Sequence, residues 1–312
     1  MRKLGDDCGS YLAEKAESQE SIWVLDGDLA DSDGAEQFSA RCPNRFVQAG
    51  ISEQCMVSAA AGMASCGIRP WVFSFAAFLC YRAYDQIRVG LSQTQLPVTL
   101  IGSHAGGCGG RNGKTHIALN DVAVISTLPN MDIWGPADGN DVRLAVDSIL
   151  SANGPNYIRL PRTPLPLLSG KPAIARWIGS PTPVALVTHG LATHWALEVQ
   201  ELLASNGVNV GVLHVNKLWP LDYILECGLL DQVRCALVLE DHAVLGGLGS
   251  LLRHIGYKGQ MKQLGWPLGW SGQSGADNDL RQAAKLTVSD IVGEIEKLDL
   301  SVTGVRKAIA CA

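Results

Sequence analysis

The chain has 312 residues, 47 % of them hydrophobic, and a formal net charge of −5 at pH 7. This length is enough for two domains of ordinary size, and the apolar content is enough for sizeable cores. The acidic balance, with no basic cluster, argues against a nucleic acid or another polyanion as a partner. The first residues lack the apolar segment of a signal peptide, and no apolar run is as long as a membrane span.

The cysteines are odd in number, nine in all, and none forms a C-x-x-C pair. This pattern is typical of reduced thiols rather than of a disulfide framework or a zinc site. We therefore expect a cytoplasmic protein.

The first half of the chain alternates between strand and helix patterns. Small apolar residues at 53–67 predict a helix, with Gly67 as its C-cap, and an amphipathic pattern predicts another at 76–94. Short apolar runs predict strands at 21–30, 46–52, 69–75, 96–104, 131–138 and 155–162. Alternation of this kind favours an α/β domain with a mostly parallel sheet.

The alternation stops at the proline-rich residues 163–183 and then restarts. Later strands are expected at 184–190, 208–215 and 235–242, with helices at 191–207 and from 246 onward. We therefore expect two α/β domains with mostly parallel sheets. The expected boundaries are a first domain at 1–165, a linker at 166–182, a second, smaller domain at 183–305 and a tail at 306–312.

The glycine-rich stretch "SHAGGCGGRNGKTH" (103–116) raises the question of a phosphate-binding P-loop. A P-loop needs G-x-x-x-x-G-K-[ST], and Gly113, Lys114 and Thr115 fit its end. The first required glycine falls on Cys108, which argues against a P-loop. The two histidines, twelve residues apart, also make a plain surface loop a poor description, because histidine is a common acid–base and hydrogen-bonding group.

Other motifs are more specific. "GISEQ" (50–54), "FAAFLCYRAYDQIR" (75–88), "LPNMDIWGPAD" (128–138) and "LVLEDHAVLGGLGS" (237–250) resemble the pyrimidine-binding and C-terminal domains of the thiamine diphosphate-dependent transketolase family. The resemblance extends from about residue 5 to 300. It implies the two-domain fold expected above.

One part of the family pattern is missing. The family's G-D-G motif with a later Asn, which holds the cofactor's diphosphate and Mg²⁺, has no counterpart, since "DGD" (26–28) has a different order. The chain therefore resembles the C-terminal subunit of a split transketolase. The resemblance implies thiamine diphosphate as cofactor, with Mg²⁺ held mainly by a separate subunit and no metal site on this chain. We expect a heterotetramer with two copies of each chain.

The resemblance assigns the residues around the cofactor's pyrimidine ring. Glu53 corresponds to the catalytic carboxylate that exchanges a proton with the ring. Taken alone, a glutamate opening a helix indicates only a favourable first-turn charge. Phe75, Phe78 and Tyr81 correspond to aromatic residues beside the ring, although core packing would suit the two phenylalanines equally well.

The resemblance turns the glycine-rich stretch into a substrate-channel loop. His104 and His116 have the family's spacing and would contact oxygens of the substrate and assist proton transfer. The family's Glu-Asp pair is replaced here by Arg111 and Asn112, and the family's aspartate selects sugar stereochemistry. We therefore expect a substrate that differs from the usual sugar phosphates, with another hydroxyl pattern or an extra anion.

Further residues align with cofactor and phosphate contacts. Asp28 aligns with a cofactor-side aspartate and Ser32 with a phosphate-binding serine. Arg162 aligns with a phosphate-binding arginine, and Arg159, slightly earlier in the same segment, is expected to replace or assist it. For each arginine a surface ion pair is the alternative.

The leading functional hypothesis is a transketolase subunit that transfers a two-carbon ketol unit from a ketose, or its phosphate, to an aldose or aldehyde. The alternatives are the beta subunit of a 2-oxoacid dehydrogenase or another thiamine-dependent carboligase, and a non-catalytic assembly subunit. The run Glu240-Asp241-His242 resembles a strand end of the family's C-terminal domain. We therefore expect no catalytic role for the second domain.

Overall fold

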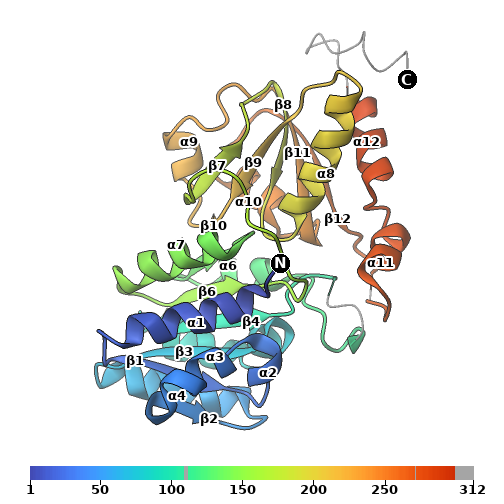
Figure 1. The fold of residues 1–312 in the computed structure, drawn as a ribbon. Helices are drawn as coiled ribbons and strands as arrows, with labels where there is room; N and C mark the ends of the chain where they lie inside the picture. Colours follow the sequence, from blue (N-terminus) through green and yellow to red (C-terminus); the bar gives the residue numbers. More distant parts are fainter. Residues whose placement is uncertain (109–111, 271, 299–312) are drawn as a thin grey trace.

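The computed structural model describes residues 1–108, 112–270 and 272–298. Two α/β domains are stacked one above the other, and the N-terminus lies at their junction (Figure 1). Each domain is built on one mostly parallel sheet. The expected fold class is confirmed.

The first sheet has seven strands in the order β10-β5-β6-β4-β3-β1-β2. All neighbours are parallel except β10, which runs antiparallel to β5. The strands are β1 (Ile22–Asp26), β2 (Phe46–Gln48), β3 (Arg69–Phe75), β4 (Thr99–Ser103), β5 (Asp132–Trp134), β6 (Asn156–Arg159) and β10 (Lys217–Trp219).

Both faces of this sheet are covered, which explains its continuous apolar strands. Successive residues of β3 pack into different hydrophobic clusters, with Trp71 and Phe73 on one side and Val72 on the other. Three helices cover the first side: α1 (Leu4–Ala16), α3 (Glu36–Arg41) and α7 (Gly139–Leu150). The second side is covered by α4 (Glu53–Ser65), α5 (Tyr84–Ile87) and α6 (Asp121–Ser126).

Helix α1 lies in direct backbone contact with the turn that follows the short helix α2 (Ala30–Asp33). A Cβ on Gly5 would overlap the carbonyl oxygen of Asp33, and a Cβ on Gly9 would overlap that of Gly34. Only glycine permits this approach. The contact brings the start of α1 beside α2, so Lys3 and Ser32 lie at the same cavity.

The segment expected as one helix at 76–94 is divided into three. It contains a π-helical turn η2 (Phe78–Arg82), α5, and a second π-helical turn η3 (Arg88–Ser92). π-Helical turns are rare and frequently occur at functional sites. An amphipathic pattern does not distinguish π-helical turns from an α-helix, so the sequence predicted the helical segment but not its division.

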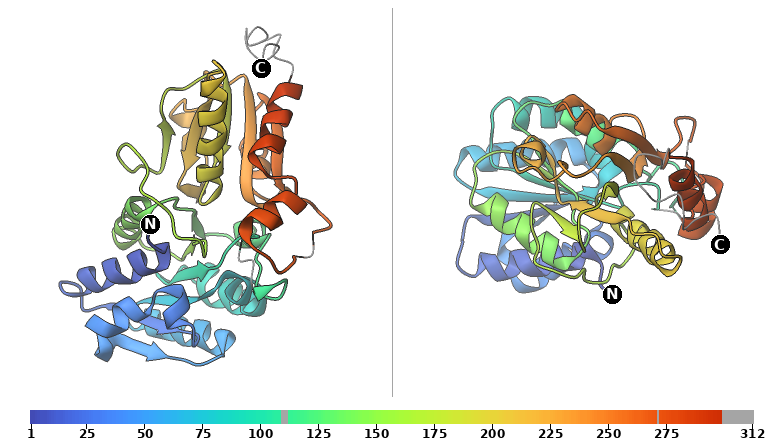
Figure 2. Two further views of the ribbon diagram at one scale, coloured as in Figure 1. Left: turned by 45° about the vertical axis from the view of Figure 1, so that its right-hand side comes forward. Right: turned by 90° about the horizontal axis from the view of Figure 1, so that it is seen from above.

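The second sheet has five strands in the order β12-β11-β8-β9-β7, with only β7 antiparallel. The strands are β7 (Ala175–Ile178), β8 (Val184–Thr188), β9 (Gly211–Val215), β11 (Cys235–Ala243) and β12 (Gln260–Trp266). The helices around it are α8 (Ala192–Ser205), α9 (Tyr223–Glu226), α10 (Leu248–His254), α11 (Asp277–Ala283) and α12 (Val288–Lys297). Figure 2 shows α8 and α12 together on one face of this sheet.

Two short edge strands differ from the expected domain organisation. Strand β7 lies inside the stretch 166–182 that was expected to be a linker, and its Arg176 pairs with Asp141 of α7. Strand β10 leaves the second domain to join the edge of the first sheet. Both strands are antiparallel edge strands of three or four residues. Such short segments lack the apolar alternation that predicts a strand.

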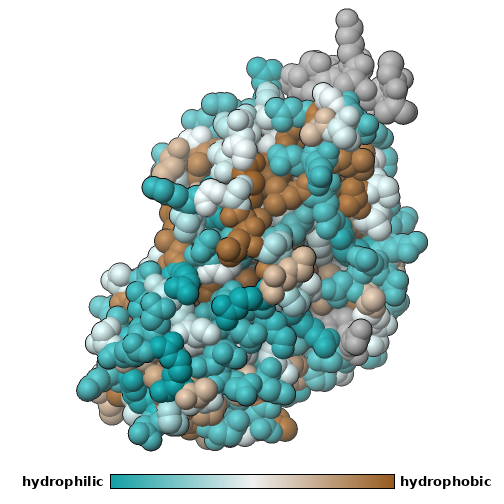
Figure 3. Space-filling view, in the orientation of Figure 1, coloured by the Kyte–Doolittle hydropathy of each residue, from teal (hydrophilic) through white to brown (hydrophobic). Residues whose placement is uncertain are grey.

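The surface is uneven in hydropathy. In the orientation of Figure 3, apolar side chains gather on the second domain, whereas the first domain is mostly hydrophilic. Among the described residues, no helix combines the length and apolar character needed to cross a membrane.

Two buried carboxyl groups lie at the end of β1. Asp26 and Asp33 are both almost fully buried, and one oxygen of each has no hydrogen-bond partner apart from the other carboxyl group. Burial, followed by the negative charge of Asp26, raises the pKa of Asp33 to about 9. Asp33 therefore keeps its proton at neutral pH, and this proton is shared with Asp26 through the hydrogen bond between the two carboxyl groups.

We expect Asp33→Asn to stabilise the protein at pH 8 by about 2 kcal/mol and to have less effect at pH 4. Unfolded Asp33 ionises near 3.8, whereas the folded residue keeps its proton up to about 9. The free energy of unfolding of the wild type therefore falls as the pH rises through this window. Asparagine at position 33 cannot ionise, so it removes this loss. Urea unfolding at both pH values measures the effect, with the exposed Asp31→Asn as control. An equal gain at both pH values would contradict the shared proton.

Candidate functional site

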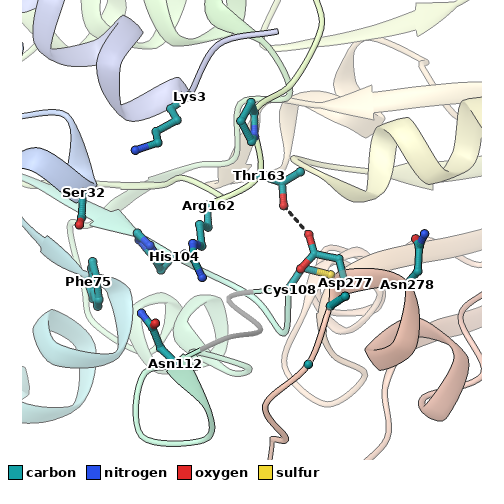
Figure 4. A pocket seen from close by; sticks show the side chains of 13 residues that line it. Lys3, Ser32, Phe75, His104, Cys108, Asn112, Arg162, Thr163, Asp277 and Asn278 are labelled. Carbon is teal, nitrogen blue, oxygen red and sulfur yellow. Dashed lines mark hydrogen bonds between the residues drawn. The ribbon is translucent and has the colours of Figure 1, made fainter.

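A cavity of about 540 Å³ opens between the two domains. Figure 4 shows side chains converging on it from the start of α1, the end of α2, the loop after β4, the segment after β6 and the start of α11. Its lining includes Lys3, Ser32, Phe75, His104, Cys108, Asn112, Arg162, Thr163, Asp277 and Asn278. The carboxyl ends of parallel strands meet here, where ligands bind in open α/β sheets.

His104 is the most constrained residue of the cavity. Its backbone has a φ of 56°, in the left-handed region, and its ring centroid lies 4.0 Å from that of Phe75. Burial, and then the positive charges of Arg162 and Lys3, lower the pKa of His104 to about 3. His104 is therefore neutral at physiological pH, so one ring nitrogen donates a hydrogen bond and the other accepts one.

Two cations give the cavity a preference for anions. Lys3 precedes α1, and Arg162 follows β6. Both lower the pKa of His104 through their charge, so both positive charges influence the part of the cavity beside His104. The hydroxyl of Ser32 is a third potential donor. Guanidinium, ammonium and hydroxyl groups together suit a phosphate or sulfonate.

Glu53 lies at a second, neighbouring opening. It is the first residue of α4, its side chain is 5 % exposed, and Arg82 Nη1 lies 3.4 Å from its Oε1. The guanidinium of Arg82 also stands 3.8 Å from the centre of the Phe78 ring. Glu53 and Arg82 line an opening of about 440 Å³ together with Ile51 and Ser52. The carboxylate is thus nearly buried but reachable from one side.

An aromatic cluster connects the two openings. The Phe75 and Phe78 rings are stacked at 5.4 Å between centroids, and the His116 ring lies 5.9 Å from Phe75 and 5.1 Å from Phe78. Of the residues predicted from the sequence, the structure brings together Phe75, Phe78, His104 and His116, with Arg82 joining Glu53 to the cluster.

Other predicted residues lie elsewhere. Asp28 is exposed and does not line the cavity. Tyr81 points away from the cavity and hydrogen-bonds Asn120, beside a separate apolar surface. Asn112 lines the cavity, whereas Arg111 lies outside the described residues. The lining also includes four residues that no sequence motif indicated: Lys3, Thr163, Asp277 and Asn278.

Arg159 is not at the cavity, contrary to the expectation that it replaces or assists Arg162. Its guanidinium is buried between the domains, where Nε lies 3.0 Å from Asp121 Oδ2 and Nη2 donates to the carbonyl of Asp241 at 2.9 Å. The physical reason is geometric. Arg159 is the last residue of β6 and its side chain is buried, whereas Arg162, three residues later, lies beyond the strand and lines the cavity.

We therefore expect Arg159→Leu to destabilise the protein by about 3–5 kcal/mol, because it leaves the buried Asp121 without its cation. Arg162→Leu should cost much less stability. Chemical unfolding of both variants measures the difference. Equal stability losses would contradict the separate roles assigned to the two arginines.

Two domain matches cover most of the chain. Residues 4–166 match the transketolase pyrimidine-binding domain, and residues 176–291 match the transketolase C-terminal domain. The chain belongs to the transketolase family. The match to the pyrimidine-binding domain contains Glu53, the aromatic cluster and Arg162, and Lys3 directly precedes it. This domain implies that the protein binds thiamine diphosphate.

Two curated relatives have a similar extent to this chain. The transketolase family protein y4mN of Sinorhizobium fredii is 33 % identical over 306 residues, spanning 93 % of this chain and 87 % of the relative. The 6-deoxy-6-sulfo-D-fructose transketolase subunit SqwH of Clostridium sp. is 32 % identical over 255 residues, spanning 79 % and 78 %.

Among solved structures, a split-gene transketolase in an inactive beta4 tetramer is 28 % identical with a TM-score of 0.83. The match covers 95 % of this chain and 98 % of that one. Together with the subunit SqwH, it confirms the resemblance to the C-terminal subunit of a split transketolase.

Proposed function

We propose that this chain is the subunit of a two-chain, thiamine diphosphate-dependent transketolase that transfers a two-carbon ketol unit from an anionic ketose to an aldose or aldehyde. The observation that best supports this proposal is the arrangement of three groups of side chains. A nearly buried glutamate, an aromatic cluster with two histidines, and a pair of cations follow one another from the opening at Glu53 to the cavity between the domains.

The residues present fit the cofactor's pyrimidine ring. Glu53 is the buried carboxylate that such a ring needs, and Phe75 and Phe78 offer a flat apolar surface. When bound, thiamine diphosphate supplies a carbon nucleophile and stabilises negative charge on the carbon that it attacks. Tyr81, also expected beside this ring, hydrogen-bonds Asn120, and Asp28, expected as a cofactor-side residue, is exposed.

The chain's own groups would act in sequence. Glu53 would hydrogen-bond a nitrogen of the cofactor's pyrimidine ring and exchange a proton with it. Poor hydration of the site would strengthen this hydrogen bond. His104, neutral at physiological pH, would donate to or accept from a substrate oxygen, and His116 lies against the Phe75 and Phe78 rings. Both histidines are placed to move protons during carbon–carbon cleavage.

The anionic end of the donor would lie on Lys3 and Arg162 with Ser32. The relative named as a 6-deoxy-6-sulfo-D-fructose transketolase subunit has a sulfonate in its named substrate. A sulfonate and a phosphate present the same oxygen geometry to these cations. Asn112, in the place of the family's aspartate, leaves the cavity without that negative charge, and Arg111 adds a cation in the sequence.

A second chain would supply the diphosphate-binding half and Mg²⁺. The split-gene relative, assembled from one kind of chain, is described as inactive. That description supports a need for a partner in this protein too. We propose a heterotetramer with two copies of each chain, working in the cytoplasm, where reduced thiols persist.

The experiment is to co-express the chain with a partner that carries the family's G-D-G…N pattern. Ketol transfer is then assayed with thiamine diphosphate and Mg²⁺ from ketose phosphates, sulfonated ketoses and neutral ketoses. Activity that needs both chains supports the proposal. Acceptance of 2-oxoacids with a lipoyl acceptor, but not of ketoses, would favour a 2-oxoacid dehydrogenase. A complex that binds cofactor but converts neither class would indicate an assembly subunit.

A further inference from the structure

One side of the loop that contains both histidines is attached to the second domain at the carboxylate of Asp241. Asp241 lies near the end of β11 and is 1 % exposed. Its Oδ1 accepts a hydrogen bond from the backbone N–H of Gly107 at 2.8 Å and another from Trp266 Nε1 at 2.7 Å. Gly107 lies three residues after His104, so this bond joins the C-terminal domain to the cavity wall.

The loop backbone is packed directly on this carboxylate. A Cβ on Gly106 would overlap Asp241 Oδ2, and a Cβ on Gly107 would overlap the Trp266 indole. Gly106 also has a φ of 88°, which favours glycine. These two glycines of the glycine-rich stretch therefore let the chain approach Asp241.

The other side of the loop is held by the same strand. Ala243 N donates to the carbonyl of Leu119 at 2.6 Å. Between these two attachments, Gly106 N donates to the carbonyl of Ala118 at 2.9 Å and closes the base of the loop. His104 and His116 thus stand on a loop whose two sides are both bonded to the last three residues of β11.

Asp241 is itself held in place from the first domain. Arg159 Nη2 donates to its carbonyl oxygen at 2.9 Å while the same guanidinium pairs with Asp121 at the start of α6. The adjacent Glu240 differs in its contacts. Its carboxylate accepts from Leu248 N at 2.5 Å and Gly249 N at 3.2 Å, both inside the second domain.

We propose that Asp241 is a positioning residue that sets the histidine loop, residues 103–108 and 112–119, against the reaction cavity. The proposal rests on the proposed function of His104 and His116. It gives the C-terminal domain a part in the reaction although Asp241 does not line the cavity. Removal of the acceptor would free Gly107 N and let His104 move from its contact with Phe75.

The test compares Asp241→Ala, Asp241→Asn and the matched control Glu240→Gln in the two-chain enzyme. Amide hydrogen exchange is measured for residues 104–108 and 112–118, together with kcat, KM and cofactor affinity. We expect Asp241→Ala to speed exchange in the loop at least about tenfold and to lower kcat/KM by about 10–100-fold. Cofactor affinity should be unchanged. Asp241→Asn keeps an acceptor for Gly107 N and should recover most of both losses, and Glu240→Gln should leave loop exchange as in the wild type.

Three results would overturn the proposal. The first is loop exchange that is unchanged in Asp241→Ala. The second is faster exchange throughout both domains, as from general destabilisation. The third is a loss in Glu240→Gln equal to that in Asp241→Ala. If Asp241→Ala does not fold, the Gly107 amide of the wild type decides: strong protection from exchange supports the bond to Asp241, and exchange at the rate of an unprotected amide overturns the proposal. If the wild-type complex transfers no ketol unit, the proposed function fails, while the exchange rates still decide whether Asp241 holds the loop.

Discussion

Replacing Glu53 by Gln is expected to lower kcat/KM for ketol transfer by about 10²–10⁴-fold, the range usual for a lost acid–base group. The amide has nearly the same shape and keeps α4 intact, but it cannot take up and return a proton. Because the side chain is only 5 % exposed, water cannot easily replace it. Steady-state kinetics of the two-chain enzyme at saturating cofactor measure the loss.

Glu36 offers a matched control for this substitution. Glu36 is the first residue of α3, as Glu53 is of α4, so both carboxylates interact with the positive end of a helix. That interaction contributes about 0.3–1 kcal/mol. If Glu53 were only a first-turn charge, Glu36→Gln and Glu53→Gln would have similar, small effects on stability and no effect on turnover. A catalytic Glu53 predicts loss of turnover in its own variant alone.

The sequence predicted the elements that a local pattern specifies. The buried strands β1, β3 and β4 are continuous apolar runs, and α4 begins at the glutamate of "GISEQ". The histidine loop was also found, because both histidines stand at a fixed spacing in a glycine-rich stretch. Each of these features depends on residues that are close together in the sequence.

The sequence did not predict what depends on distant contacts. Lys3 reaches the cavity only because Gly5 and Gly9 let α1 lie against the turn after α2. The carboxylate of Asp241 meets Gly107 across 134 positions of chain. Arg159 and Arg162 are close in sequence and have the same side chain. Strand β6 ends at Arg159, which makes a buried ion pair, whereas Arg162 lies beyond the strand and lines the cavity.

The second large effect is expected when either cation of the cavity, Arg162 or Lys3, is replaced by an uncharged residue. We expect Arg162→Leu, and separately Lys3→Met, to raise KM for phosphorylated or sulfonated ketoses by about 10–100-fold with little change in kcat. A charge-assisted hydrogen bond contributes about 1.5–3 kcal/mol, and about 1.4 kcal/mol corresponds to tenfold in binding. The anionic end is remote from the reacting carbon, so its contacts hold substrate and transition state equally. Kinetics with an anionic and a neutral ketose measure the change.

The neutral ketose is what makes this prediction specific. It has no group for Arg162 to hold, so its kinetics should be the same in wild type and variant if the cation serves only to bind the anion. Lys171→Met, which removes an exposed charge that does not line the cavity, controls for the overall field of the protein. If KM rises equally for the neutral ketose, Arg162 shapes the cavity instead of binding the substrate's anion, and the preference for anionic donors loses its basis.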